Sequence, residues 1–214
     1  MRLFPVCLLL PVALTALVSG CAAQNRIAHT PEPIASAGLN KAPIEQPVKM
    51  DADAQGYTAN AFRVGQVIVA GQPTEATLEK LSKEGCTLVV NIRTPEEMND
   101  RKRVPFDEAE TLKRLNIEYV FIPLGGPNKE FPYTPEATDK FAAALARHNS
   151  GPVLLHCQVG YRASHLWAAY LVRTRGMTPD DAFALGSKMV MNEQPFENLA
   201  GLKVEYLPKP AETN

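Results

Sequence analysis

From residue 57 onward, the chain alternates short apolar runs with amphipathic stretches. Two short runs, residues 62–64 and 66–70, are separated by a glycine and predict a small hairpin. Continuous β-branched and apolar runs are typical of strands buried on both faces, and they occur at residues 88–92, 119–122 and 153–155. Apolar residues at helical spacing, bounded by Thr-Pro pairs or Gly, predict helices over residues 74–84, 107–115, 134–150, 163–175 and 178–189. This alternation predicts a three-layer α/β/α domain with a short, mainly parallel sheet.

The first 20 residues have the layout of a secretory signal, with Arg2 before an apolar run and small residues at its end. The run contains two prolines and is shorter than the roughly 20 residues that a helix needs to span a bilayer. Residues 18–21 (Val-Ser-Gly-Cys) resemble a bacterial lipobox, in which Cys21 becomes the lipidated first residue. By that resemblance, Ala22 favours the outer membrane. We therefore expect a lipoprotein of the bacterial cell envelope that faces the periplasm, with an uncleaved anchor as the alternative.

Residues 21–56 combine the lipidated Cys with a Pro/Ala-rich stretch that has no aromatic residue. Such a stretch buries too little apolar surface to offset the entropy lost on ordering. It is therefore predicted to be an extended tether. The α/β domain then covers residues 57–200, and residues 201–214 form a Pro-containing C-terminal tail.

Composition and charge narrow the class of protein. The chain has 22 Lys and Arg against 23 Asp and Glu, and its longest basic run is Arg101-Lys102-Arg103. Without a positive field to attract phosphate backbones, no nucleic-acid partner is expected. A hydrophobic content of 45% with 21% charged residues excludes a polytopic membrane protein and a fully disordered chain.

The loop between the strand at 153–155 and the next helix contains the candidate chemistry. Ligands bind at the carboxyl ends of strands in open α/β sheets, and helix N-termini attract anions. Gly160 allows backbone N–H groups to point inward, and the Arg162 guanidinium can hold two oxygens of an oxyanion. A thiol between a helix N-terminus and a cation ionises readily, so a Cys157 thiolate facing a bound anion is predicted. The predicted anion-binding residues are Gln158, Val159, Gly160, Tyr161, Arg162 and Ala163.

Four further segments match one family: residues 70–73 (Ala-Gly-Gln-Pro), 90–93, 119–123 and 151–157. With them, residues 60–189 resemble the bacterial dual-specificity-type, cysteine-dependent protein phosphatases, including the phosphatase-like domain of beta-lactamase hydrolase-like proteins. The resemblance implies hydrolysis of a phosphorylated protein or small molecule through a phosphocysteine on Cys157, with no metal and no cofactor. It also implies that Arg162 holds the equatorial oxygens and Ser164 stabilises the departing thiolate. His156 would adjust the reactivity of the Cys157 thiol, or alternatively form a hydrogen bond to a buried backbone group.

Two departures from that family leave alternatives open. Four residues separate Cys157 from Arg162, where cysteine phosphatases usually have five. The shorter loop also resembles that of rhodanese sulfurtransferases, so a Cys157 persulfide is the second reading. The loop at 123–130 contains no Asp to act as general acid, and Glu130 is the candidate in its place. Losing a positioned acid typically costs about 10²–10⁴ in rate, so weak activity on poor leaving groups is expected of the phosphatase. The missing acid also favours a third interpretation, a non-catalytic anion-binding lipoprotein.

Outside the signal and the lipobox, the chain has two cysteines, Cys86 and Cys157. Cys86 precedes its predicted strand, whereas Cys157 follows a different strand. Because the two strands are expected to be parallel and about five residues long, they would separate the two cysteines by roughly 17 Å. A disulfide needs Cα atoms within about 7 Å. Two free thiols are therefore expected, with Cys86 a small buried side chain. A purely structural Cys157 would leave Gly160 and Arg162 unexplained.

Simpler roles are expected for other side chains near the loop. Arg93 lies at the same sheet edge as Cys157 and is expected to form a salt bridge rather than contact substrate. In the helix after the loop, His165 is expected to be structural or solvent-facing, and Trp167 to be in the core. Tyr161 is expected to project as a wall of the substrate site. Four acidic residues are expected on a solvated surface or at a helix start: Glu96, Glu97, Asp107 and Glu108.

Overall fold

The computed structural model describes residues 34–125 and 130–203. The predicted signal (residues 1–20), the lipobox Cys21 and most of the predicted tail lie outside the described residues. Within the described ranges, no helix has the length and apolar character required to cross a membrane.

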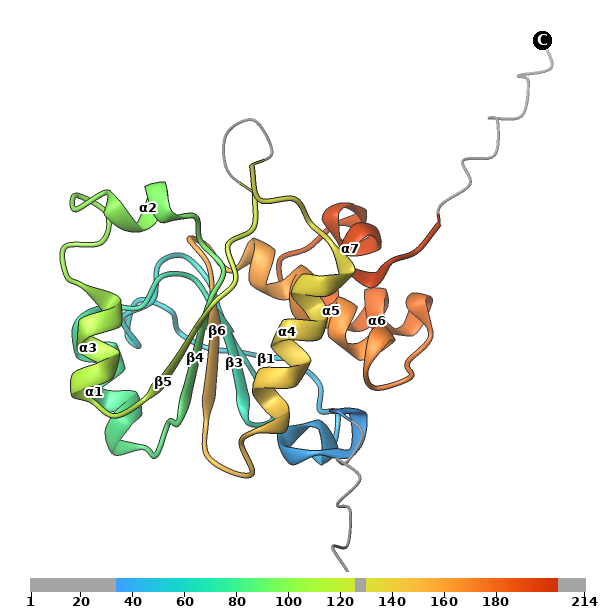
Figure 1. Ribbon diagram of the computed structural model, residues 1–214, viewed down its shortest axis with the longest axis horizontal. Coiled ribbons are helices and arrows are strands. Elements are labelled where there is room, and N and C mark those ends of the chain that lie inside the picture. Colours follow the sequence, from blue (N-terminus) through green and yellow to red (C-terminus); the bar gives the residue numbers. More distant parts are fainter. Residues whose placement is uncertain (1–33, 126–129, 204–214) are drawn as a thin grey trace, which may run out of the picture. The chain divides into compact units, whose positions relative to one another are not determined.

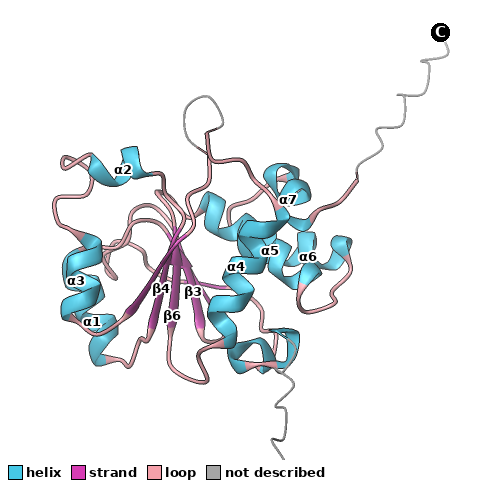
Figure 2. Cartoon of the chain, in the orientation of Figure 1, coloured by secondary structure: helices cyan, strands magenta, loops and turns pink. Residues whose placement is uncertain are grey.

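A six-stranded mixed sheet forms the centre of the domain (Figure 2). Its strands are β1 (Val48–Lys49), β2 (Ala61–Val64), β3 (Val67–Ala70), β4 (Leu88–Asn91), β5 (Glu118–Phe121) and β6 (Val153–His156), in the order β1-β2-β3-β6-β4-β5. The pairs β3–β6, β6–β4 and β4–β5 are parallel, whereas β2 is antiparallel to both β1 and β3. The predicted hairpin is therefore β2–β3, and the predicted parallel strands form the rest of the sheet.

Helices cover both faces of the sheet, which confirms the three-layer prediction (Figure 1). On one side lie α1 (Glu75–Lys83) and α3 (Glu108–Arg114), and on the other lie α4 (Pro135–Ala146), α5 (Tyr161–Arg173), α6 (Pro179–Gly186) and α7 (Glu193–Ala200). Successive side chains of a strand point to opposite faces. Accordingly, Val89 of β4 belongs to the same apolar cluster as Leu78 and Leu112, whereas its neighbour Val90 belongs to the cluster of Phe141.

The helices predicted from the apolar pattern are all present with small shifts of their ends, but α2 (Pro95–Asn99) and α7 are additional. Helix α2 has only five residues, too few for an apolar period. Its sequence signal is instead a capping box. The Thr94 Oγ1 accepts from the Glu97 backbone N–H at 3.2 Å, and the Glu97 carboxylate accepts from the Thr94 N–H at 2.8 Å.

The tether prediction is wrong for residues 34–56, which belong to the same compact unit as the domain. Strand β1 pairs with β2, and the Leu39 side chain is buried in the core. The Asn40 side chain donates to the Ala142 carbonyl at 3.1 Å and accepts from the Tyr170 hydroxyl at 3.0 Å. A stretch too polar to fold alone can therefore still dock on a preformed surface and gain its partners there.

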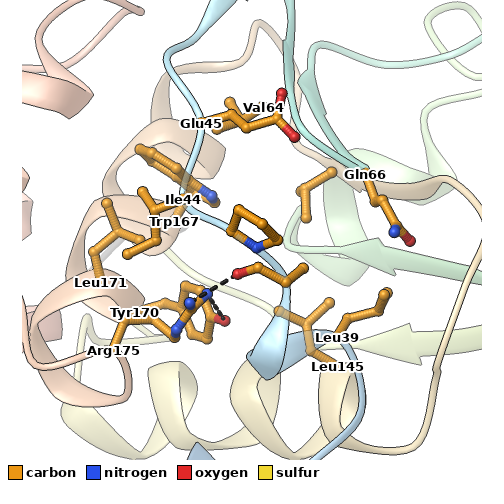
Figure 3. Close-up of a pocket in the computed structure, with 13 residues that line it drawn as sticks. Leu39, Ile44, Glu45, Val64, Gln66, Leu145, Trp167, Tyr170, Leu171 and Arg175 are labelled. Atoms are coloured by element: carbon orange, nitrogen blue, oxygen red, sulfur yellow. Dashed lines mark hydrogen bonds between the residues drawn. The ribbon is translucent and has the colours of Figure 1, made fainter.

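Figure 3 shows this docking around a small pocket between the segment near Ile44 and helix α5. Trp167 and Tyr170 of α5 line the pocket beside Leu39. The guanidinium of Arg175 donates to the Ala42 carbonyl at 2.8 Å and to the Tyr170 hydroxyl at 3.4 Å. Trp167 is buried in the core, as predicted.

Candidate active site

Three parallel strands end at the same level of the sheet and bring the candidate residues together. Ala70 of β3 and Asn91 of β4 are both in register with His156 at the end of β6. Cys157 follows directly, and Arg93 follows β4 two residues after Asn91. The nucleophile candidate thus lies at the carboxyl edge of the parallel strands, where α/β proteins bind their ligands.

The loop from Cys157 to Arg162 turns into α5 at Gly160. The φ of Gly160 is +88°, and a Cβ there would lie 3.3 Å from the Asn60 Cβ. This left-handed conformation favours glycine because it has no side chain to clash. Gly160 therefore lets the chain turn into α5, which starts at Tyr161, four residues after Cys157.

The carbonyl groups of this loop bind to the surrounding scaffold. The Gln158 carbonyl accepts from the Gln72 N–H at 3.1 Å, and the Val159 carbonyl accepts from the Asn60 side chain at 2.9 Å. The backbone N–H of Cys157 donates to the Ala70 carbonyl at 3.2 Å. The backbone of the loop is thus held in place by β3 and by the residues around it.

Both described cysteines are free thiols, as the spacing argument predicts. Cys86 is buried, and burial raises the pKa of its thiol to about 11. It is therefore a neutral core side chain. Cys157 is only 1% exposed and lies within electrostatic range of Arg162 and Arg93.

Arg162 is held by a bidentate ion pair with Glu97. Its Nη1 and Nη2 donate to the two carboxylate oxygens at 2.8 and 2.6 Å, and Nη1 also donates to the Leu124 carbonyl at 2.7 Å. Burial alone would lower the pKa of Arg162, but the Glu97 hydrogen bonds and the nearby Cys157 together raise it above its usual value. The guanidinium therefore stays charged and fixed in orientation at the mouth of the loop.

The expectation that Glu97 lies on a solvated surface is wrong. Burial raises the pKa of Glu97, but the hydrogen bonds from Arg162 and from the Thr94 N–H outweigh it and hold that pKa below its usual value. The capping box of α2 turns the carboxylate toward the loop, where the fork of Arg162 matches its two oxygens. Glu96, by contrast, is exposed as expected.

Glu108 is also not on the surface: it is 2% exposed and lies beneath the nucleophile loop. Its carboxylate accepts from Gln72 Nε2 at 2.7 Å and from Asn91 Nδ2 at 2.9 Å, and it lies 3.0 Å from His156 Nε2. Burial raises the pKa of Glu108, but His156 and the two amides hold it below its usual value. The Glu108 carboxylate thereby fixes the side chain of His156, the residue that precedes Cys157. The neighbouring Asp107 caps α3, as expected, by accepting from the Glu110 N–H at 3.1 Å.

The Ala-Gly-Gln-Pro segment, residues 70–73, links Glu108 to Glu97 through the side chains of Gln72 and Arg93. A Cβ on Gly71 would lie 1.8 Å from the Thr58 carbonyl oxygen, so no side chain fits there. Gln72 accepts from Arg93 Nη1 at 2.7 Å while donating to Glu108. Arg93 also faces Glu97, with Nε 3.8 Å from its carboxylate, which agrees with the predicted salt bridge. The Gln72 amide thus connects the buried Arg93 guanidinium to the buried Glu108 carboxylate under the nucleophile loop.

The remaining candidates lie as follows. The Ser164 hydroxyl is buried and donates to the Gly160 carbonyl at 3.0 Å. The Tyr161 hydroxyl donates to Asn192 Oδ1 at 2.5 Å, and its ring contacts His165 at a centroid distance of 4.3 Å. His165 is fully buried between the Tyr161 and Asn192 carbonyls, so its role is structural.

Glu130, the predicted general acid, is exposed and follows residues 126–129, which lie outside the described part of the chain. Val159 is exposed at the tip of the nucleophile loop, and Ala163 is buried in the first turn of α5. Within the described ranges, no group of three or more His, Cys, Asp or Glu side chains is arranged to hold a metal ion.

A cysteine at the carboxyl edge of a mainly parallel sheet, followed by an arginine in the first turn of the next helix, is the arrangement of the cysteine-phosphatase fold. A family model described as "DSP-PTPase phosphatase fused to NAD+ Kinase" matches residues 43–203. The chain belongs to this family.

Among curated proteins, the chain is similar to the beta-lactamase hydrolase-like protein of Xylella fastidiosa, with 28% identity over 123 residues. The match covers 56% of this chain and 27% of that protein, so the chain spans about a quarter of its relative's length.

Two solved structures show the same fold. The DUF442 protein of Shewanella putrefaciens CN-32 is 22% identical, with a TM-score of 0.51 over 70% of this chain and 93% of its own. PTPMT1 in complex with PI(5)P is 19% identical, with a TM-score of 0.50 over 64% of this chain and 88% of its own.

Proposed function

We propose that the chain is a cysteine-dependent phosphomonoester hydrolase that acts through a phosphocysteine on Cys157. The observation that carries this proposal is the loop itself. Cys157 lies at the sheet edge, the loop carbonyls of Gln158 and Val159 are held by the scaffold, and Arg162 is held in the first turn of α5 by Glu97. Family membership and the shared fold support the same reaction class.

In the proposed mechanism, the Cys157 thiolate attacks phosphorus and forms a P–S bond while the P–O bond to the leaving group breaks. Arg162 and the loop amides stabilise the charge on the three non-bridging oxygens. Water then attacks phosphorus, the P–S bond breaks, and inorganic phosphate leaves. The hydroxyl of Ser164 stabilises the returning thiolate after turning from the Gly160 carbonyl.

The leaving oxygen needs a proton unless it is stable as an anion. Glu130 is the proposed proton donor. Its side chain is exposed, so it must approach the nucleophile loop to donate this proton. Aryl phosphates with acidic leaving groups do not need this proton. They are therefore the substrates on which activity should first be measured.

The four-residue spacing between Cys157 and Arg162 favours a second candidate, a sulfurtransferase that carries a persulfide on Cys157. A persulfide needs room for one sulfur atom, whereas phosphate needs room for three oxygens around phosphorus. The two candidates therefore differ in the size of the group that the loop accepts, and they share the same nucleophile.

One experiment separates the candidates: the reduced protein from residue 32 onward is assayed in parallel with an aryl phosphate and with thiosulfate plus cyanide. We expect phosphate release that orthovanadate inhibits, because vanadate mimics the pentacoordinate state of phosphorus. Thiocyanate formation without phosphate release would replace the phosphatase proposal by the sulfurtransferase. Anion binding with no turnover in either assay would identify a binding protein.

We also propose that Cys21 is lipidated and holds the domain at the bacterial outer membrane, facing the periplasm. The proposal is supported by the Val-Ser-Gly-Cys motif and by Ala22 after it. In cells that express the full chain, we expect the protein in the outer-membrane fraction, and the Cys21→Ser variant outside it. Equal membrane association of both forms would contradict lipidation at this residue.

A further inference from the structure

An open cleft of about 420 Å³ lies beside the nucleophile loop. Its lining consists of Thr58, Gln72, Arg93, Arg103 and Gln158. All five lining side chains are neutral or cationic, and Gln158 directly follows Cys157 in the chain. A ligand group in this cleft would therefore lie next to the proposed reaction centre and would meet two guanidinium groups.

Arg103 is oriented toward the loop by Gln158. With the side-chain amide of Gln158 placed according to its partners, its oxygen accepts from Arg103 Nη1 at 3.2 Å, and its nitrogen donates to Glu97 Oε1 at 3.3 Å. The other contact of Arg103 is an exposed ion pair with Asp100, at 3.4 Å from Nε. Exposed pairs of this kind contribute little, so most of the charge of Arg103 is available to a ligand.

Arg93 is the second cation and is only 1% exposed. Its Nη1 donates to Gln72 at 2.7 Å and its Nη2 donates to the Glu97 carbonyl at 3.2 Å. Its Nε has no hydrogen-bond partner among the described residues. A buried donor without a partner is costly, and the Glu97 carboxylate, 3.8 Å from this Nε, lies too far away for a hydrogen bond.

Glu97 is the carboxylate that lies closest to both Arg93 and Arg162 beside the cleft. Glu97 is the ion-pair partner of Arg162 and lies 3.8 Å from Arg93, and it also accepts from the amide that orients Arg103. Glu97 is thus shared by Arg162 and Arg93, whereas Arg103 has the exposed Asp100 as its ion-pair partner. Arg162 is assigned to the reacting phosphate, which leaves Arg93 and Arg103 facing a separate space.

We infer that this cleft binds a second phosphate group of the substrate, so that the preferred substrates are small molecules carrying two phosphates. The inference rests on the proposed hydrolase function, because it places the first phosphate at Cys157. The volume of the cleft exceeds that of one phosphate, which leaves room for part of the carbon skeleton that joins the two groups.

The test compares fructose 1,6-bisphosphate with fructose 6-phosphate by kcat/KM for phosphate release. A charged hydrogen bond to the second phosphate should favour the bisphosphate by roughly 10- to 100-fold. In the Arg103→Gln variant, this ratio should fall toward one. In the matched Lys102→Gln variant, which removes an exposed neighbouring cation that does not line the cleft, the ratio should stay as in the unmodified protein.

A binding measurement separates failure of this inference from failure of the proposed function. Calorimetric titration of the Cys157→Ser variant with both sugars needs no turnover, and we expect tighter binding of the bisphosphate that is lost when Arg103→Gln is added. Turnover of an aryl phosphate with equal kcat/KM for the two sugars would overturn the cleft assignment alone. Absence of all turnover together with selective bisphosphate binding would overturn the hydrolase and keep the anion site.

Discussion

Replacing Cys157 by Ser is expected to reduce phosphate release from an aryl phosphate by about 10⁴-fold or more. A serine hydroxyl is a much weaker nucleophile than a cysteine sulfur at neutral pH. The side chain is buried and similar in size to cysteine, so the fold should persist. The measurement is kcat/KM under reducing conditions, with thermal unfolding of both proteins to confirm that the variant is folded.

Cys86→Ser is the matched control, because Cys86 is the other free, buried cysteine of the described chain. Its thiol donates to the Leu88 carbonyl at 3.4 Å at the start of β4, while Cys157 follows the end of β6. We expect the kcat/KM of the Cys86→Ser protein for phosphate release to be close to that of the unmodified protein. If the Cys157→Ser protein kept full activity, or if only the Cys86 variant lost it, the assignment of the nucleophile would be wrong.

Replacing Glu108 by Ala is expected to lower the free energy of unfolding by about 3–5 kcal/mol. The substitution leaves Gln72, Asn91 and His156 without their shared buried acceptor. For a chain of this size, that loss corresponds to a fall in Tm of roughly 6–20 °C. Because His156 directly precedes Cys157, we also expect lower kcat in the fraction that remains folded. Thermal unfolding and activity below the Tm measure the two effects.

The control for this substitution is Glu110→Ala, on the same helix but exposed, where the expected change is within about 0.5 kcal/mol. The pKa of Glu108 is held below the ordinary value of 4.5. Its charged form therefore contributes fully above about pH 4.5, and the contribution is lost as the pH falls through the lowered pKa. The stability difference between the unmodified and Glu108→Ala proteins should be constant near pH 7 and shrink below pH 4.5. A difference that grew on acidification would contradict the buried carboxylate.

The local structure of the loop from Cys157 to Arg162 could be predicted because its parts are contiguous in the chain. The strand ending at His156, the cysteine, the glycine at φ +88° and the arginine occupy seven successive residues. Local rules for strands, left-handed glycines and helix N-termini apply directly to such a segment.

The groups that hold this loop could not be predicted, because their partners are distant in the sequence. Glu97 pairs with an arginine 65 positions away, and Glu108 contacts a histidine 48 positions away. Each lies in or beside a short helix rich in acidic residues, where an exposed position is the ordinary outcome. The capping box at Thr94 was the one local signal that Glu97 turns back toward its helix start.

The segment at residues 34–56 shows that sequence-based prediction of the fold has the same limit. Its composition correctly indicates that it cannot form a core of its own, but burial of Leu39 and pairing of β1 depend on a surface made by α4, α5 and β2. Composition describes what a segment can bury by itself. It does not describe what the rest of the chain offers to it.

By itself, the sequence determined the α/β class, the main strands and helices, and the position of the loop with Cys157 and Arg162 between a strand and a helix, because periodicity and turn chemistry are local properties. Only the tertiary structure decided the strand order β3-β6-β4, the burial of Glu97 and Glu108, and the cationic cleft beside Gln158. These features arise where segments far apart in the chain meet at one sheet edge, and electrostatic and packing energies depend on distances in space.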